Sequence, residues 1–578
     1  VTSALVMLSL GGGLLATLWQ MRVAQAERSS AIQKFNDLRH LAGTFTFDFY
    51  NAIKEVPGTS AAQQLVVKTG LDYLDKLAAQ SQANPVLQTE VAAGYYQLGT
   101  IQSGGLYSGL HLGDSSGALA SHRKAITLRE TLLKDNPFDT ANQLELAQGY
   151  ATFAGLLFDT GDEPGALATI RKARRLSEEV VKADPANAQA RLKLIQVCQS
   201  HYLICGNMSY FTESMGALEK ARQTGEELVG REAGKPAYLD SLALVYRALG
   251  LQYWLRGEPE KAWQVYQQAQ QIYERLLAQE PSSQSARRGL LVVKALRADL
   301  QNYHGDSNLA LKSIESALAQ AVALASADPN NLAAKRDLNS CYGKMGDTFK
   351  ALGRYRMALL QYQKVSATDE ELVAKDRLNT RNRRVLAGDK TSIGQLLFKM
   401  HDSYQALMLV RQACDSYEEM LVNEPSARNL NREYAQALHL LARLEFQAGR
   451  TTEARAATKR AFAIQQKVLE QPETLGILHH EYAWPLLTCA PPELRDPAKG
   501  LIHARLAVEQ TQGKEPNFLK TLALAYHLTG DQTAARLAAR KGLALLPVND
   551  SIPTTLRKEM EELLAEIEKT STSRAPRT

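Results

Sequence analysis

A recurring alanine constrains the fold of this chain more than any other feature. It returns at a near-constant interval of about 48 residues, a regular spacing that indicates a tandem helical repeat. The anchors are Ala118, Ala166, Ala217, Ala262, Ala310, Ala358, Ala406 and Ala454. Two further units with shorter spacing follow, anchored on Gly500 and Ala535. A chain of 578 residues built from such units grows in one dimension and needs no single large core.

Glycine and proline mark the turns of each unit. A glycine stands five residues before the anchor in Gly113, Gly161, Gly257, Gly305, Gly353 and Gly449, and Gly530 precedes Ala535 in the same way. Because glycine takes the left-handed conformation at little cost, it predicts the end of a first helix. A proline at a fixed distance after the anchor predicts the end of a second helix, which it cannot continue: Pro137, Pro185, Pro281, Pro329 and Pro425. The last unit ends in the same manner at Pro547.

The small and large residues between these turns carry a family resemblance. In the clearest unit the first helix holds Gly250 and Tyr253, and the second helix holds Ala262, Tyr266 and Ala269 on one face. Small residues at crossing points let paired helices approach, while tyrosine fills the next gap. This pattern resembles the tetratricopeptide repeat, and two other units share it through Gly346, Gly353, Ala358, Gly530 and Ala535.

The resemblance implies an all-α solenoid, a right-handed superhelix of helix hairpins. The period of about 48 residues exceeds the usual value of about 34, and we predict that the second helix is about two turns longer. We predict about ten units over residues 81–547, a capping helix over 548–570 that closes the solenoid, and a disordered tail over 571–578.

Charge and cysteine content narrow the function classes. The net charge of +6 is small for this length and is spread along the chain, so nucleic acid is not an expected partner. The cluster Arg381, Arg383 and Arg384 predicts a solvated loop. The five cysteines form neither a disulfide framework nor a metal set, and are interpreted as small buried hydrophobic residues.

Residues 1–21 form an apolar run without charge that is long enough to span a bilayer. Trp19 and Arg22 stand where interfacial residues of a membrane helix are found. A secretory signal is the alternative, but its apolar core is normally shorter and follows a basic segment. We predict a transmembrane helix here, in a chain whose N-terminus is truncated, because Val1 lies inside the apolar run.

Residues 22–80 follow as a juxtamembrane region. An alternating three-four spacing of apolar residues over 24–52 is a heptad seam and suggests a homodimer, although a single amphipathic helix packed on the first repeat fits the same pattern. A further helix is expected from Ser60 to Gln80, with its buried positions at Leu65, Val66, Leu71, Tyr73 and Leu74.

Two segments, one in this region and one in the first repeat, carry a second resemblance. Residues 34–80 and 95–126 resemble the part just outside the membrane helix in bacterial serine/threonine protein kinases of the acidobacterial type. The resemblance implies a single-pass membrane protein, with a kinase domain inside the cell and the repeats outside the cytoplasm, in the periplasm. The chain itself lacks kinase motifs, since Asp48-Phe49 is followed by Tyr50 rather than glycine.

Other catalytic or metal sets are absent from the sequence. His479, His480 and Glu481 are adjacent and point to different faces of a helix, with no second histidine at metalloprotease spacing. We therefore expect no enzyme activity, no cofactor and no metal in this chain. An unrecognised enzyme built on the repeats is the least favoured alternative.

The concave surface of the solenoid is the expected binding surface for a protein or peptide. Counting from the anchors places seven candidate residues on it: Arg247, Leu251, Trp254, Asp347, Lys350, Lys520 and His527. The lysine and asparagine set that clamps a C-terminal carboxylate in tetratricopeptide domains is not reproduced in register. The leading hypothesis is a membrane-anchored sensor or scaffold, the outer half of a receptor-type kinase; the alternative is a free-standing membrane-anchored scaffold for complex assembly with no kinase.

Overall fold

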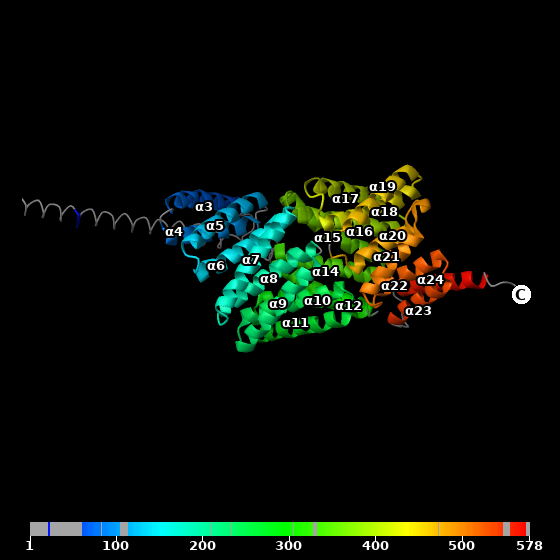
Figure 1. The fold of residues 1–578 in the computed structure, drawn as a ribbon, viewed down its shortest axis with the longest axis horizontal. Coiled ribbons are helices and arrows are strands. Elements are labelled where there is room, and N and C mark those ends of the chain that lie inside the picture. The colour runs from blue at the N-terminus through cyan, green and yellow to red at the C-terminus, as the bar shows by residue number, and fades with distance from the viewer. Residues whose placement is uncertain are drawn as a thin grey trace, which may run out of the picture.

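The computed structural model describes residues 21–22, 60–81, 84–103, 114–208, 210–232, 234–303, 306–327, 332–471, 473–546 and 555–573. Within these ranges the chain is helical and contains no strand. Ten helix hairpins follow one another between an N-terminal helix, α3 (Ser60–Gln80), and a C-terminal helix, α24 (Thr555–Ser573). Figure 1 shows α3 and α24 at opposite ends of the body that these hairpins form.

Each hairpin pairs an even-numbered first helix with an odd-numbered second helix. The first helices are α4 (Pro85–Ser103), α6 (Thr140–Asp159), α8 (Ala188–Asn207), α10 (Pro236–Leu255), α12 (Gln284–Tyr303), α14 (Leu332–Ala351), α16 (Thr380–Lys399), α18 (Arg428–Gln447), α20 (Gly476–Thr488) and α22 (Pro516–Thr529). The second helices are α5 (Ser115–Asp135), α7 (Glu163–Ala183), α9 (Phe211–Arg231), α11 (Pro259–Gln279), α13 (Ser307–Ala327), α15 (Tyr355–Lys375), α17 (Ser403–Asn423), α19 (Thr451–Leu469), α21 (Pro497–Gln510) and α23 (Gln532–Leu545). A short 3-10 helix, Pro492–Leu494, precedes α21.

The period is more regular than the alanines suggest. From α5 to α19 every second helix begins one full period after the previous one, and the anchor is its fourth residue. In α9 this position is Ser214, which is fully buried, so the assignment of Ala217 as the anchor was wrong. A buried serine fits the same narrow crossing as alanine, which is why the period persists where the alanine does not.

Both helices of the long units are extended, not the second helix alone. The first helices from α6 to α18 have 20 residues and the second helices from α5 to α17 have 21, whereas α22 and α23 have 14 each. The extra residues are therefore divided between the two helices, which keeps the paired helices equal in length.

The turns form as the glycines and prolines predict. Gly161, Gly257, Gly353, Gly449 and Gly530 all have positive φ, between 70° and 95°, whereas Gly113 and Gly305 lie outside the described residues. The proline turns are held by a repeated hydrogen bond of 2.5–2.9 Å, in which a side chain near the start of the first helix donates to the proline carbonyl. Its donors are Gln143, Arg191, Arg287 and Asn431.

The hairpins coil so that the solenoid closes on itself. Asp159, at the end of α6, forms an ion pair with Arg381 on α16, and Asn207, at the end of α8, accepts a hydrogen bond from Asn429 on α18. Ser115 on α5 donates to Asp376, which ends α15, over 2.6 Å. Each bond joins a hairpin to the hairpin five units later, so one superhelical turn holds about five hairpins. We call this line of contacts the seam.

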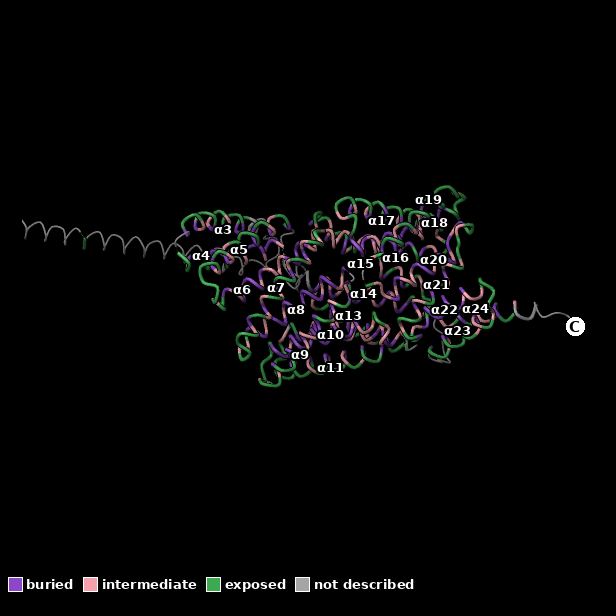
Figure 2. The backbone as a smooth tube through the Cα atoms, in the orientation of Figure 1, coloured by how far each residue is buried: buried purple, intermediate pink, exposed green. Residues whose placement is uncertain are grey.

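Burial follows the helix pairs rather than one central core. Apolar residues are buried between successive helices in several separate clusters, and Figure 2 shows exposed backbone along the outer helices such as α9 and α11. In α3 the residues Val66 and Leu74 are buried as predicted. Leu65 is 64% exposed, so its predicted burial was wrong. All five cysteines are free and buried, as expected.

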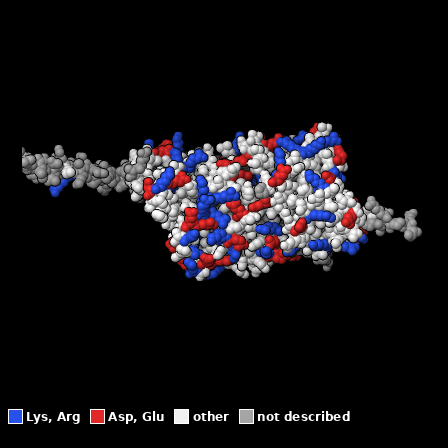
Figure 3. Space-filling model, viewed as in Figure 1, with Lys and Arg blue, Asp and Glu red and all other residues white. Residues whose placement is uncertain are grey.

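Charged side chains of both signs are interspersed on the surface, as Figure 3 shows for one face. Many pair between neighbouring helices, and two ion pairs of 2.6 Å illustrate a repeated spacing of 36 residues, Arg191–Glu227 and Arg383–Glu419. No large basic patch lies on the face in view, in keeping with the spread of charge along the sequence.

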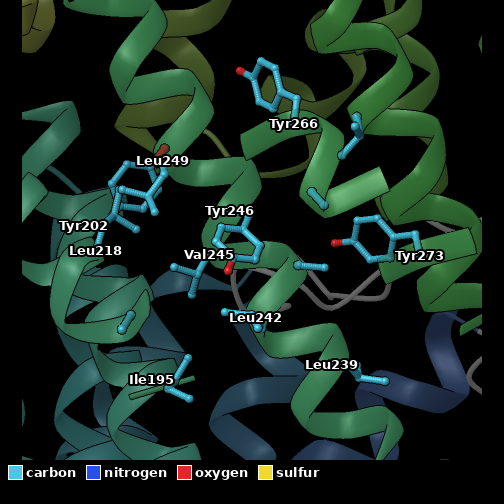
Figure 4. Packing of buried hydrophobic residues seen from close by; sticks show 14 of the residues in the cluster. Ile195, Tyr202, Leu218, Leu239, Leu242, Val245, Tyr246, Leu249, Tyr266 and Tyr273 are labelled. Atoms are coloured by element: carbon cyan, nitrogen blue, oxygen red, sulfur yellow. The ribbon is translucent and has the colours of Figure 1, made fainter. Parts of the chain in front are cut away.

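The anchor residues pack as the small-and-large pattern predicts. A Cβ on Gly250 would lie 2.3 Å from Cε1 of Tyr266, and a Cβ on Gly346 would lie 2.6 Å from Cε1 of Tyr362. Figure 4 shows Tyr266 and Tyr273 among the side chains buried around α10. Tyr253 is half-buried and bonds Glu219. The alanine anchors are fully buried: Ala262, Ala269, Ala358, Ala406, Ala454 and Ala535.

Several predictions fall outside the described residues: the membrane helix except Met21, the heptad seam over 24–52, Pro329 and Pro547, and the tail after Ser573. No helix among the residues described combines the length and hydropathy that crossing a membrane requires. At the C-terminus α24 continues to Ser573, so it includes three residues of the segment predicted to be disordered.

Candidate protein-binding groove

Side chains of the first helices form most of the lining of the three cavities described below. One cavity lies across α16, α18 and α20, has a volume of about 540 Å³, and is lined by residues that include Phe398, Leu440 and Trp484. We call this cavity the groove. Its volume is within the range of small-ligand and peptide sites.

None of the seven predicted residues lines the groove, but three groove residues stand at repeat positions equivalent to predicted ones. His439 stands four periods after Arg247, Arg443 four periods after Leu251, and Phe398 three periods after Trp254. All three line the groove. The repeat positions chosen from the sequence are therefore those that face inward in α16 and α18.

Two cations of the groove have no carboxylate partner among the described residues. The Arg443 guanidinium lies 4.7 Å above the ring of Phe398, and Lys399 Nζ lies 5.9 Å from the ring of Tyr355. Burial lowers the pKa of Arg443. Glu481 also lines the groove, but both of its oxygens bind Arg432 at 2.5–2.6 Å. The groove thus presents positive charge beside aromatic surface.

Of the three histidines that line the groove, His401, His439 and His480, the last two are neutral and differently placed. Burial lowers the pKa of His439 to about 4, and its Nε2 lies 2.9 Å from Gln465 Oε1 while its Nδ1 has no hydrogen-bond partner among the described residues. Burial, with the Lys520 charge second, lowers the pKa of His480 to about 4; its ring stacks on Phe518. His439 thus has one buried ring nitrogen without a hydrogen-bond partner among the described residues.

The groove is framed by a ladder of ion pairs between successive first helices. Arg288 bonds Asp337 at 2.5 Å, Arg384 bonds Glu433 at 2.8 Å, and Arg432 bonds Glu481 at 2.5 Å. The two partners are always 49 residues apart. Pairs that are partly removed from water hold their partners in fixed geometry. The ladder therefore fixes the spacing of the helices that carry the groove.

The predicted residues of α10 lie in a different cavity. Leu251 and Trp254 line a cleft of about 570 Å³ between the two superhelical turns, where α8 and α10 face α18, α20 and α22. Trp254 also packs edge-on against Tyr303, with ring centroids 5.2 Å apart. Arg247 is half-buried and its charge acts on Asp240. Burial raises the pKa of Asp240, although the Ser285 hydrogen bond and the Arg247 charge act to lower it.

The other predicted residues have partners within the chain. Asp347 accepts a hydrogen bond of 2.7 Å from the Tyr362 hydroxyl and lies 3.6 Å from Lys350, which is exposed. The capping helix α24 covers Lys520 and His527: Lys520 bonds Glu559 at 2.7 Å and His527 lies 3.8 Å from Glu566. Lys520 Nζ also lies 5.0 Å from the Trp484 ring, so it borders the groove.

The basic cluster on α16 corrects a prediction. Arg381, Arg383 and Arg384 belong to the first turns of the helix rather than to a solvated loop, and each lies beside a carboxylate of another helix. Sequence reasoning missed the ladder although a signal was present. Arginine recurs once per period in four first helices: Arg288, Arg336, Arg384 and Arg432.

Two clusters of metal-ligating residue types have other roles. His201, Cys205 and Glu213 place one ligand atom each within 4.8 Å, but Arg171 binds both oxygens of Glu213 at 2.6–2.9 Å, which makes the cluster an ion-pair network. His479 faces His503 while Glu481 faces Arg432, so these neighbours on α20 do point in different directions, as predicted.

A family profile agrees with the repeat assignment. The profile is described as tetratricopeptide repeat and matches residues 435–473. The curated proteins compared include no match. The solved structures include BtubC (BKLC) from P. vanneervenii, with 17% identity, 46% of this chain and 94% of that chain covered and a TM-score of 0.35. They also include yeast Tom70, with 12% identity, 92% of this chain and 98% of that chain covered and a TM-score of 0.36. The apo form of RapI has 13% identity, 75% of this chain and 99% of that chain covered and a TM-score of 0.39. The profile match and the ten hairpins describe a tetratricopeptide-type helical repeat protein, an architecture that serves protein–protein interaction.

Proposed function

We propose that this chain binds an extended segment of a partner protein in the groove across α16, α18 and α20. The observation that carries the proposal is the pairing of aromatic surface with cations that lack an acid partner among the described residues, Arg443 over Phe398 and the nearby Lys399. Aromatic and arginine side chains in a concave, partly desolvated site are typical of residues that dominate binding energy. The partner segment accordingly carries acidic residues next to aromatic or aliphatic ones.

Selection of peptides from a random displayed library against the chain tests this proposal. Selected peptides are expected to combine Asp or Glu with apolar residues, and Arg443→Glu should weaken their binding about tenfold or more, because a like charge replaces the attraction. The matched control is Arg505→Glu on α21, whose guanidinium lies 5.2 Å above the Tyr526 ring outside the groove. Equal binding by the two variants would refute the proposal.

We further propose that residues 1–21 tether the chain to a membrane, with the repeats in the periplasm, as the outer half of a receptor-type serine/threonine kinase. The uncharged run at the N-terminus and the resemblance of residues 34–80 support this reading. Partner binding in the groove would then change the pairing of two copies through residues 24–52 and bias autophosphorylation inside the cell.

Sequencing the DNA upstream of the Val1 codon tests the kinase part. An in-frame kinase domain that ends in a basic stretch before the apolar run is the expected result. A start codon with only a short leader would refute it and leave a membrane-anchored assembly scaffold.

A further inference from the structure

A second interior cavity, separate from the groove, lies near the N-terminal end of the solenoid. Its volume is about 400 Å³, and its walls are the first helices α4, α6, α8 and α10, with α14 and α16 completing it across the seam. The lining is mostly polar and includes Thr152, Ser200 and Arg336. This cavity, called here the axial cavity, therefore touches both superhelical turns.

Two buried polar atoms at the axial cavity have no hydrogen-bond partner among the described residues: Gln148 Oε1 and Asn382 Nδ2. Buried polar atoms are nearly always bonded, because an unmade bond costs about 1–3 kcal/mol. The two atoms comprise one acceptor and one donor. An occupant of the axial cavity must therefore offer polar groups of both kinds.

Arg336 breaks the ion-pair ladder at this place. It occupies the repeat position of Arg288, Arg384 and Arg432, each of which binds a carboxylate 49 residues later. For Arg336 the residue at that spacing is Val385, and Arg336 makes no ion pair or hydrogen bond with any described residue. One guanidinium of the ladder thus faces the axial cavity without a partner in the described part of the chain.

The carboxylates near Arg336 are bound elsewhere. Asp337 is held by Arg288 at 2.5 Å, and Asp159 lies 3.5 Å from Arg381. Asp369 accepts from Asn339 at 3.3 Å. Burial lowers the pKa of Arg336, with the neighbouring Arg381 charge second, whereas the charges of Asp159, Asp369 and Asp337 act in the opposite direction. Arg336 thus lies near these carboxylates without a direct ion pair in the described part of the chain, and its guanidinium N–H groups are left to bind an external anion.

We propose that the axial cavity binds a small hydrophilic oxyanion, a carboxylate or phosphate compound, whose anionic group binds Arg336. The planar guanidinium suits carboxylate and phosphate oxygens, which it binds in bidentate fashion. Gln148, Asn382 and the hydroxyls of Thr152 and Ser200 bind the polar remainder of the molecule. Because the ligand touches both turns, its binding stabilises the closed solenoid. This site is independent of peptide binding in the groove.

The test measures binding of citrate and of inorganic phosphate to the full chain by calorimetry and thermal unfolding, with glucose as the uncharged probe. Citrate or phosphate should raise the unfolding temperature and glucose should not; the stronger of the two anions identifies the preferred oxyanion. Arg336→Gln should weaken anion binding about tenfold or more. Absence of binding by both anions at millimolar concentration would overturn the proposal.

A second variant restores the ladder and keeps the test independent of folding defects. Val385 is 41% exposed, so Val385→Glu can place the missing carboxylate beside Arg336 and should abolish anion binding without lowering stability. Val385→Thr is the matched control and should bind as the natural chain does. Unchanged anion binding by Val385→Glu or by Arg336→Gln would overturn the assignment, whereas peptide binding in the groove should persist in both.

Discussion

The close approach of Gly250 to Tyr266 makes a quantitative prediction for Gly250→Ala. The added Cβ would lie 2.3, 2.5 and 2.7 Å from three ring atoms of Tyr266, a side chain that is 1% exposed. The tyrosine ring cannot swing into solvent, so helices α10 and α11 must separate. Overpacking of this kind costs about 1–3 kcal/mol.

The identical substitution elsewhere isolates that cost. Gly216, in the interior of α9, has no atom within 4 Å of an added Cβ, and Gly216→Ala should therefore stabilise its helix by about 1 kcal/mol. The same gain in helix propensity applies to Gly250→Ala. The difference between the two variants is thus the clash alone, about 1–3 kcal/mol.

Amide hydrogen exchange is the suitable assay, because a solenoid can unfold in parts and a single unfolding temperature averages over them. The change in protection of α10 and α11 caused by Gly250→Ala should be less favourable than the change in α9 caused by Gly216→Ala. The clash should account for a difference of about 5- to 150-fold between the two protection factors. Protection in the distant helices α22 and α23 should not change. Replacing Tyr266 by leucine in the same chain should remove most of the loss, since it vacates the space that the methyl group needs.

Equal effects of the two alanine substitutions would refute the reasoning. Such a result would mean that the glycine is not required by the approach of the tyrosine, and that its recurrence at Gly346 opposite Tyr362 has no packing cause.

Three further outcomes are expected. Burial and the neighbouring Asp369 raise the pKa of Asp389 to about 8, so the folded state retains a proton that the unfolded state releases above about pH 4. The free energy of unfolding should therefore fall as the pH rises from about 4 to 8. Asp389→Asn should flatten the matching decline in the unfolding temperature, and an unchanged pH profile would count against this assignment. Ser115→Ala removes a hydrogen bond of 2.6 Å to Asp376 across the seam and should cost about 1.5–3 kcal/mol, seen as faster exchange in α5 and α15 but not in α22. Lys520→Ala should loosen α24, measured as faster proteolysis of the C-terminal helix, and equal digestion rates would contradict this.

The turns and crossing points could be predicted because each depends on one residue. A positive φ at Gly257 and a fully buried Cβ at Ala262 are requirements of a single position, which a sequence displays directly. The predicted concave positions rest on the same anchors, since inward-facing positions are expected to repeat with the period. His439 and Phe398 stand at positions equivalent to Arg247 and Trp254, but the candidates named from the sequence lie in other repeats.

The ion pairs and the closure could not be read in the same way. Arg381 looked like part of a solvated loop because its carboxylate, Asp159, lies in a hairpin five units earlier in the chain. The division of the extra residues between both helices was missed because the anchors fix the length of the repeat but not the length of each helix within it. Covering of Lys520 by α24 depends on how the last helix folds back, which no repeat position encodes.

The seam follows from the period once the length of a helix is known. Five periods amount to about 240 residues, far more than one hairpin can bridge. The bond between Asn207 and Asn429 spans 222 residues, and the Asp159–Arg381 pair has the same separation. The bonds Ser115–Asp376 and Thr212–Glu473 span 261 residues. The span of 222 residues is shorter than five periods, and the span of 261 residues is longer. Each differs from five periods by close to the 20 or 21 residues of one helix.

Each seam bond therefore joins the turn at one end of a hairpin to the opposite end of the hairpin five units later. The superhelix rises by one helix length per turn, about 30 Å at 1.5 Å per residue. Longer helices would need a steeper rise for the same edges to meet. Where the hairpins shorten, the register changes: Gly257 lies near Glu515, six units later. Helix length thus determines superhelical pitch. The extra residues in both helices of each long unit set the distance between the two superhelical turns that enclose the axial cavity.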